Sequence, residues 1–121
     1  MTDRLRAVPA WGWLAAIVAL SFALRAWLAR GPFGPFIMVD ELIYSELARS
    51  VAAGDGFEVR DVPASGFSLV YPVLISPAYA LFDALPTAYA AVKTLNALLM
   101  SLAAVPAYFL ARRLAEVELG R

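Results

Sequence analysis

Two long apolar stretches restrict what this chain can fold into, because each is long enough to cross a lipid bilayer. The first, AVPAWGWLAAIVALSFALRAWLA, runs from Ala7 to Ala29, and the second runs without interruption from Thr87 to Leu114. About 20 apolar residues in a helix cross a hydrocarbon core of about 30 Å. Because 62% of the residues are hydrophobic and only 17% are charged, the sequence predicts an all-α membrane protein.

The flanks of the first stretch predict its orientation. Arg4 and Arg6 precede it, and basic residues beside a span favour the cytoplasmic side of the membrane. We therefore expect a multi-pass protein of the cell membrane (inner or plasma membrane) with a cytoplasmic N-terminus. The alternative is a cleaved signal peptide. Against it, Arg25 interrupts the end of the apolar region and no Ala-x-Ala site follows.

The polar segment from Arg30 to Gly66 is expected to form an external loop. It is too long to lack structure, because loops beyond about 15 residues usually carry structure or function. Within it, DELIYSELARSVAA, Asp40 to Ala53, is followed by Gly54, a suitable C-terminal cap. The pattern predicts an amphipathic helix lying along the membrane surface, with apolar residues four apart at Ile43, Leu47 and Val51. From Gly56 to Gly66 we expect a turn-rich return with at most a short strand.

A third apolar segment, FSLVYPVLISPAYALFDAL, runs from Phe67 to Leu85 and contains Pro72 and Pro77. Its length is marginal for a span, and proline in membrane helices marks kinks or broken ends. It either crosses the membrane, which makes three spans in all, or re-enters, which leaves two. Three spans would put Arg112 and Arg113 outside, against the charge bias, whereas two would put them inside. Both arrangements stay open at this point.

Composition excludes several kinds of chemistry. The chain has neither Cys nor His, which removes thiolate nucleophiles, imidazole bases and the commonest zinc ligands. Ten basic residues balance ten acidic ones, and no basic stripe with interleaved aromatic residues is present, so we expect no binding to nucleic acid. Any reaction must use carboxylates, hydroxyls, Arg, Lys or the backbone.

Two adjacent carboxylates, Asp40 and Glu41, stand at the head of the predicted loop helix. The simpler interpretation is that Asp40 caps the helix and that Glu41 complements the helix dipole. The functional interpretation rests on the large apolar residues on both sides, FIMV before and LI after. A carboxylate at such a low-dielectric boundary becomes more basic and suits general base catalysis. As hard oxygen ligands the pair would accept a divalent cation, but two carboxylates without further ligands define no metal site.

Three further features have both a plain and a functional interpretation. Arg25, near the end of the first span, is expected to snorkel, to pair or to bind phosphate. Tyr71 directly precedes Pro72. The plain interpretation is an aromatic residue at the membrane interface before a proline kink, and the functional one is a residue of a binding site. Lys93 and Asn96 lie one turn apart, which is typical of an anchor at the cytoplasmic face. The same helix has a face of small residues suited to close packing: Ala91, Ala97, Ser101, Ala104 and Ala107.

The order of these features resembles a known enzyme group. A first span that ends in an Arg is followed by an external Asp-Glu pair, a G-x-G exit, a YP...P segment and the pattern NALL...PAYFLARRL. This order is similar to the N-terminal part of GT-C fold membrane glycosyltransferases of family 39, which includes protein O-mannosyltransferases and aminoarabinose lipid A transferases. The resemblance covers nearly the whole chain, and its sharpest element is Asp40-Glu41. It favours three membrane spans, whereas the composition slightly favours two.

The resemblance implies an inverting glycosyltransferase that takes a sugar from a polyprenyl-phosphate donor. The acceptor would be a glycan, lipid or protein on the outer face of the membrane, and no cofactor is expected for certain. Asp40 matches the acidic residue that acts as catalytic base or binds the acceptor, with Glu41 beside it, and Arg25 and Tyr71 would bind substrate. Family members have many more spans, so we expect this 121-residue chain alone to be incomplete and inactive.

Two other functions are compatible with the sequence. The chain could be a small non-catalytic multi-pass protein, an accessory or scaffold subunit whose alanine-rich stretch from Thr87 to Leu114 packs against a partner. It could also be part of a transporter built around the proline-containing segment, but the acids then lie outside the spans rather than at the midplane where transporters bind their substrates.

Overall fold

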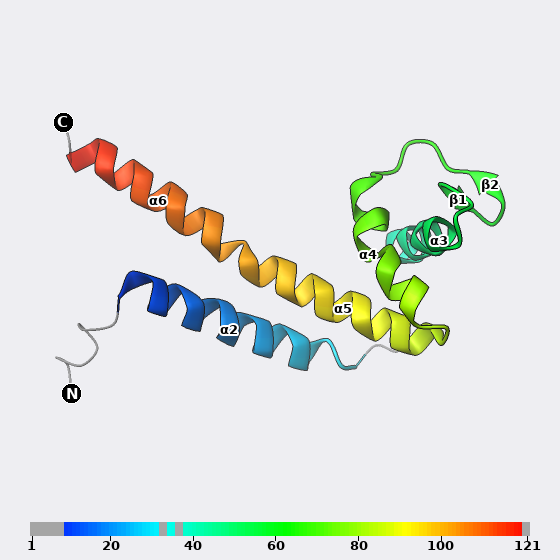
Figure 1. Cartoon of the computed structure of the whole chain (residues 1–121), viewed down its shortest axis with the longest axis horizontal. Helices are drawn as coiled ribbons and strands as arrows, with labels where there is room; N and C mark the ends of the chain where they lie inside the picture. Colours follow the sequence, from blue (N-terminus) through cyan, green and yellow to red (C-terminus); the bar gives the residue numbers. More distant parts are fainter. Residues whose placement is uncertain (1–8, 32–33, 36–37, 120–121) are drawn as a thin grey trace. The chain divides into compact units, whose positions relative to one another are not determined.

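The computed structural model describes residues 9–31, 34–35 and 38–119, and most of these are helical (Figure 1). Arg4 and Arg6, on which the predicted orientation rests, lie outside the described residues. In chain order the elements are α2 (Ala10–Leu28), α3 (Val39–Ala53), β1 (Glu58–Val59), β2 (Val62–Pro63), α4 (Val70–Leu81), α5 (Leu85–Leu102) and α6 (Ala104–Leu119). They form two compact units. The terminal unit joins residues up to Leu28 with those from Asn96 onward, and the central unit is Ala29–Leu95.

In the terminal unit, α2 lies alongside α6 and runs in the opposite direction (Figure 1). None of the 19 residues of α2 is buried, so its apolar surface is available to a lipid environment. The small residues Ala97 and Ser101 are buried, and the Ser101 hydroxyl donates a hydrogen bond of 3.2 Å to the Ser21 hydroxyl of α2. At these two positions, the small-residue face that was predicted to pack against a partner protein is instead covered by other residues of the same chain.

The predicted continuous helix from Thr87 to Leu114 is divided in two. α5 ends at Leu102 and α6 begins at Ala104. Pro106 explains the break: it has no N–H to donate to the Leu102 carbonyl four residues earlier, and its ring crowds that carbonyl. Together the two helices still form an apolar stretch, Leu85–Glu118, that is long enough to cross a membrane, as α2 also is.

α4 is shorter than the predicted segment Phe67 to Leu85, since it covers only 12 residues, Val70–Leu81. At about 1.5 Å per residue it is about 18 Å long, well below a hydrocarbon core of about 30 Å. Phe82 has an extended backbone, and Pro86 cannot donate to the Phe82 carbonyl, so α4 cannot continue into α5. In the described part of the chain, two helices meet the length and apolarity of a span, and α4 does not.

The core of the central unit lies between α3, α4 and the start of α5. Ala48 of α3, Ile75 and Ala78 of α4 and Val92 of α5 form one buried apolar cluster. Leu47, on the predicted apolar face of α3, is fully buried. The predicted apolar face of α3 is therefore covered by protein completely at Leu47 and partly at Ile43 and Val51, and the helix packs against α4.

The ends of α3 and the return from it follow local backbone rules. Gly54 adopts a left-handed conformation with φ of 87° and donates its N–H to the last carbonyls of α3, so the predicted C-terminal cap is confirmed. β1 and β2 pair as a hairpin, where at most one short strand was predicted. Its two turn residues, Arg60 and Asp61, both have positive φ, 52° and 63°, as a two-residue turn that matches the strand twist requires.

Candidate functional site

The two predicted catalytic carboxylates have different surroundings. Asp40 is the second residue of α3 and is exposed. It makes no hydrogen bond or ion pair with any residue that the structure describes. The N-cap of α3 is Met38, without a side-chain hydrogen bond, so the interpretation of Asp40 as the N-cap is wrong. The predicted burial beside apolar residues is also absent for Asp40, because Met38 and Val39 before it are themselves exposed.

Glu41 is half-buried and is held by a residue of α5. Its carboxylate accepts a hydrogen bond of 3.4 Å from the Tyr89 hydroxyl. The Lys93 ammonium lies over the Tyr89 ring, 5.2 Å from its centre, at a distance typical of a cation–π contact. Lys93 also donates to the carbonyl of Ala29. The Glu41–Tyr89–Lys93 network therefore joins the first turn of α3 to α5 and to the residue that follows α2.

This network changes the interpretation of Lys93. Lys93 was predicted to anchor the cytoplasmic face, at the opposite end of a span from the loop. Its hydrogen bond to Ala29 and its contact with Tyr89 instead place it beside the loop.

Tyr71 lies in the first turn of α4 and belongs to an aromatic cluster. The Tyr71 and Tyr44 rings pack edge to face with their centres 5.5 Å apart. The Tyr44 and Phe67 rings pack in the same way with their centres 6.2 Å apart. Such edge-to-face pairs are favourable because the positive ring edge meets the negative ring face. Tyr44 lies four residues after Asp40, on the same side of α3. Tyr71 is therefore linked to the helix of Asp40 through one aromatic side chain.

Arg25 belongs to the terminal unit, in the last turn of α2. Its Nε donates to the Ser21 hydroxyl at 3.2 Å, and its Nη1 contacts the Met100 sulfur at 3.7 Å. Of the four predicted site residues, Asp40, Glu41 and Tyr71 thus lie in the central unit and Arg25 lies in the terminal unit.

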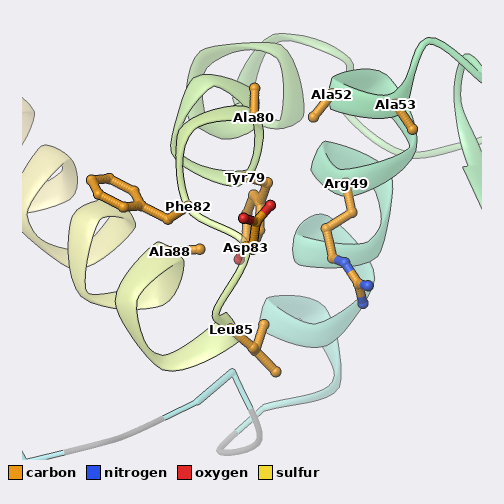
Figure 2. A pocket seen from close by; sticks show the side chains of 9 residues that line it. All are labelled: Arg49, Ala52, Ala53, Tyr79, Ala80, Phe82, Asp83, Leu85 and Ala88. Atoms are coloured by element: carbon orange, nitrogen blue, oxygen red, sulfur yellow. The ribbon is translucent and has the colours of Figure 1, made fainter.

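A cavity of about 490 Å³ opens between α3, the end of α4 and the start of α5 (Figure 2). Its polar lining includes Arg49, Tyr79 and Asp83. Arg49 forms an ion pair with Glu46 at 3.2 Å. Burial raises the pKa of Tyr79 above its usual value, so this phenol is neutral at physiological pH. None of the four predicted site residues lines the cavity, and its polar residues come from separate segments with no spacing that would predict it.

Among the described residues, no group of three or more Asp and Glu side chains is arranged to hold a metal ion. Asp40 is exposed, and Glu41 is engaged by Tyr89. The two neighbouring carboxylates therefore face different surroundings.

Tyr89 and Lys93 are the residues that sequence analysis missed or assigned elsewhere. The available signal is their spacing, since a Tyr and a Lys four residues apart share one face of a helix. The spacing predicts their mutual contact but not their partners, Glu41 and Ala29, which are 48 and 64 residues away.

Tyr89→Phe is expected to loosen the first turn of α3, because it removes the hydroxyl that holds Glu41 and keeps the ring under Lys93. The loss of one such hydrogen bond costs about 1 kcal/mol. Amide hydrogen exchange at residues 43–46, whose N–H groups bond to the carbonyls of the first turn, should therefore become about fivefold faster. The matched control is Tyr44→Phe, whose hydroxyl forms no hydrogen bond with the described residues. Equal exchange rates in both variants would contradict the role of the network.

Comparison with protein-family models found no match, and comparison with curated proteins and with solved structures found no significant similarity.

Proposed function

We propose that this chain is the N-terminal membrane part of a glycosyltransferase that moves a sugar from a polyprenyl-phosphate donor to an acceptor outside the membrane. The observation that carries the proposal is the state of Asp40, which is exposed and unpaired among the described residues at the head of α3. It lies twelve positions beyond Leu28, where the apolar helix α2 ends. A general base must reach its substrate and must not already be neutralised by a cation.

In the proposed reaction the acceptor hydroxyl oxygen attacks the anomeric carbon of the sugar. The bond from that carbon to the phosphate oxygen breaks, the polyprenyl phosphate leaves with the electron pair, and inversion results. Asp40 takes the proton of the acceptor hydroxyl. Glu41 would take no part in the proton transfer, because its carboxylate is already bound by Tyr89; it would position the first turn of α3 instead.

The leaving phosphate carries negative charge and needs a positive partner. By the family resemblance Arg25 would bind substrate through its guanidinium, whose five N–H donors meet Ser21 and Met100 among the residues that the structure describes. Tyr71 remains the proposed second substrate-binding residue, within the aromatic cluster of α3 and α4. Both assignments rest on the family resemblance.

We further propose two membrane spans, α2 and the α5–α6 stretch. The support is the length of α4 and the hydrogen bond from Lys93 to Ala29. If α4 crossed the membrane, the start of α5 would lie about 30 Å from the end of α2, too far for this bond. With two spans, Arg112 and Arg113 fall on the same side as Arg4 and Arg6, which agrees with a cytoplasmic location for both ends.

The test uses native membranes that contain the protein as its gene encodes it, and matched membranes from cells that lack the gene. Both are supplied with a panel of polyprenyl-phosphate sugars labelled in the sugar, and transfer of label to membrane or external acceptors is measured. We expect at least one donor to be used only when the protein is present, and reintroduction of the gene to restore transfer. Equal transfer from every donor in both membranes would refute the proposal.

A further inference from the structure

α4 has two apolar faces, of which one is buried in the protein and the other is exposed. On one face Pro72, Ile75 and Ala78 are buried against the rest of the central unit. The other face, here named the α4 stripe, consists of Val70, Val73, Leu74 and Leu81, and Val70 and Leu81 are three-quarters exposed. These positions are spaced by three, one and seven residues, so they share one side of the helix. A helix that is apolar on both sides is expected to be covered on both.

The charged residues of this region lie on α3 rather than on α4. α4 contains no charged side chain in its whole sequence, VYPVLISPAYAL. α3 carries Asp40 and Arg49 as exposed residues and turns its buried residues toward the core shared with α4. The pair of helices is therefore amphipathic as a pair, with a polar outer surface on α3 and an apolar outer surface on α4.

We propose that the α4 stripe lies in the acyl chains of the bilayer leaflet on the loop side, so that α4 is embedded in the membrane and α3 rests on top of it. This differs from the expectation that α3 itself contacts lipid, because Leu47 and Ala48 of α3 are fully buried in protein.

Lipid is the occupant that the connectivity favours. Only three residues, Phe82 to Ala84, separate α4 from α5, and three residues span at most about 11 Å. α5 begins an apolar stretch long enough to cross a membrane, so the end of α4 is tied to within a short distance of that stretch. At about 18 Å, a 12-residue helix cannot cross the bilayer. The apolar outer face of α4, tied beside a stretch that can span and backed by the polar outer face of α3, is suited to the headgroup–acyl boundary of one leaflet.

The test uses single Cys residues, because these 121 residues contain no Cys of their own, and any Cys that the gene encodes outside them is first replaced by Ser. Single Cys residues are introduced at Val73 and Val70 on the stripe, and at Ala53 at the exposed end of α3. Each is labelled with an environment-sensitive fluorophore in the full-length protein. The labelled proteins are placed in vesicles of phosphatidylcholine and phosphatidylglycerol, with or without a nitroxide on the acyl chains. All three positions are exposed, so the substitutions remove no core contact, and the two stripe positions check each other.

We expect the acyl-chain nitroxide to remove most of the fluorescence at Val73 and Val70 and little at Ala53, whereas aqueous iodide should do the reverse. If iodide quenches all three positions alike, the stripe faces water and the proposal is wrong. If neither quencher reaches the stripe, a protein surface covers it, and the proposal is equally wrong. The result does not depend on sugar transfer, so it can fail or succeed separately from the proposed function.

Discussion

Asp40→Asn is expected to lower sugar transfer by about 100- to 10,000-fold, the range that a general base contributes. Asn has the shape of Asp but cannot take the acceptor proton at neutral pH. Because Asp40 is exposed and makes no hydrogen bond or ion pair with the described residues, the amount of protein in the membrane should not change. Initial transfer rates in native membranes, divided by the amount of inserted protein, measure the effect.

Glu41→Gln is the matched control at the neighbouring position. The amide oxygen of Gln can still accept the hydrogen bond from Tyr89, so the first turn of α3 should keep its position. We expect the transfer rate to fall by less than about tenfold, the effect of losing about 1.4 kcal/mol of transition-state stabilisation. A rate in Asp40→Asn that equals that of the unmodified protein, or an equal loss in both variants, would show that Asp40 is not the base.

Ile75→Ala is expected to lower the stability of the central unit by about 2 to 5 kcal/mol, the usual cost of truncating a large buried aliphatic side chain. Ile75 is 1% exposed and packs with Ala48 of α3 and Val92 of α5. Its loss leaves a cavity at the point where the three helices meet. Amide hydrogen exchange of α3 and α4 in detergent or vesicles measures the free energy of opening.

Val73→Ala, two residues away on the same helix, controls for truncation alone. Half of the Val73 side chain is exposed, so its removal should change the free energy of opening by less than about 1 kcal/mol. Similar exchange rates in the two variants would mean that α4 does not form the core of this unit. The aromatic cluster of Tyr44 and Tyr71 would then lose its support as well.

The helices that follow from local pattern were predictable from the sequence. The apolar length of residues 10–28 and the placement of Gly54 after the loop helix required no knowledge of distant residues, and α2 and α3 were found within a few residues of their predicted bounds. The break at Ala103 was also encoded locally, through Pro106. It was missed because apolar composition alone does not distinguish a continuous helix from one interrupted by a proline.

The candidate site was only partly predictable. Adjacent carboxylates at a helix start could be recognised. That Tyr89 binds Glu41, while Asp40 has no partner in the described part of the chain, depends on a residue 48 positions beyond Glu41. No periodicity connects such distant residues. Which of α3 and α4 presents an apolar outer surface likewise depends on which of their faces pack together. Both sequences contain enough apolar residues to present such a surface.

The joint at Ala103 has a consequence for motion. An intact helix resists bending because bending stretches its hydrogen bonds, but at Pro106 the bond to the Leu102 carbonyl is already absent. The stretch formed by α5 and α6 is therefore compliant at one point and stiff on either side. A change of angle there breaks no hydrogen bond to Pro106, so bending of the α5–α6 stretch is expected to concentrate at this joint.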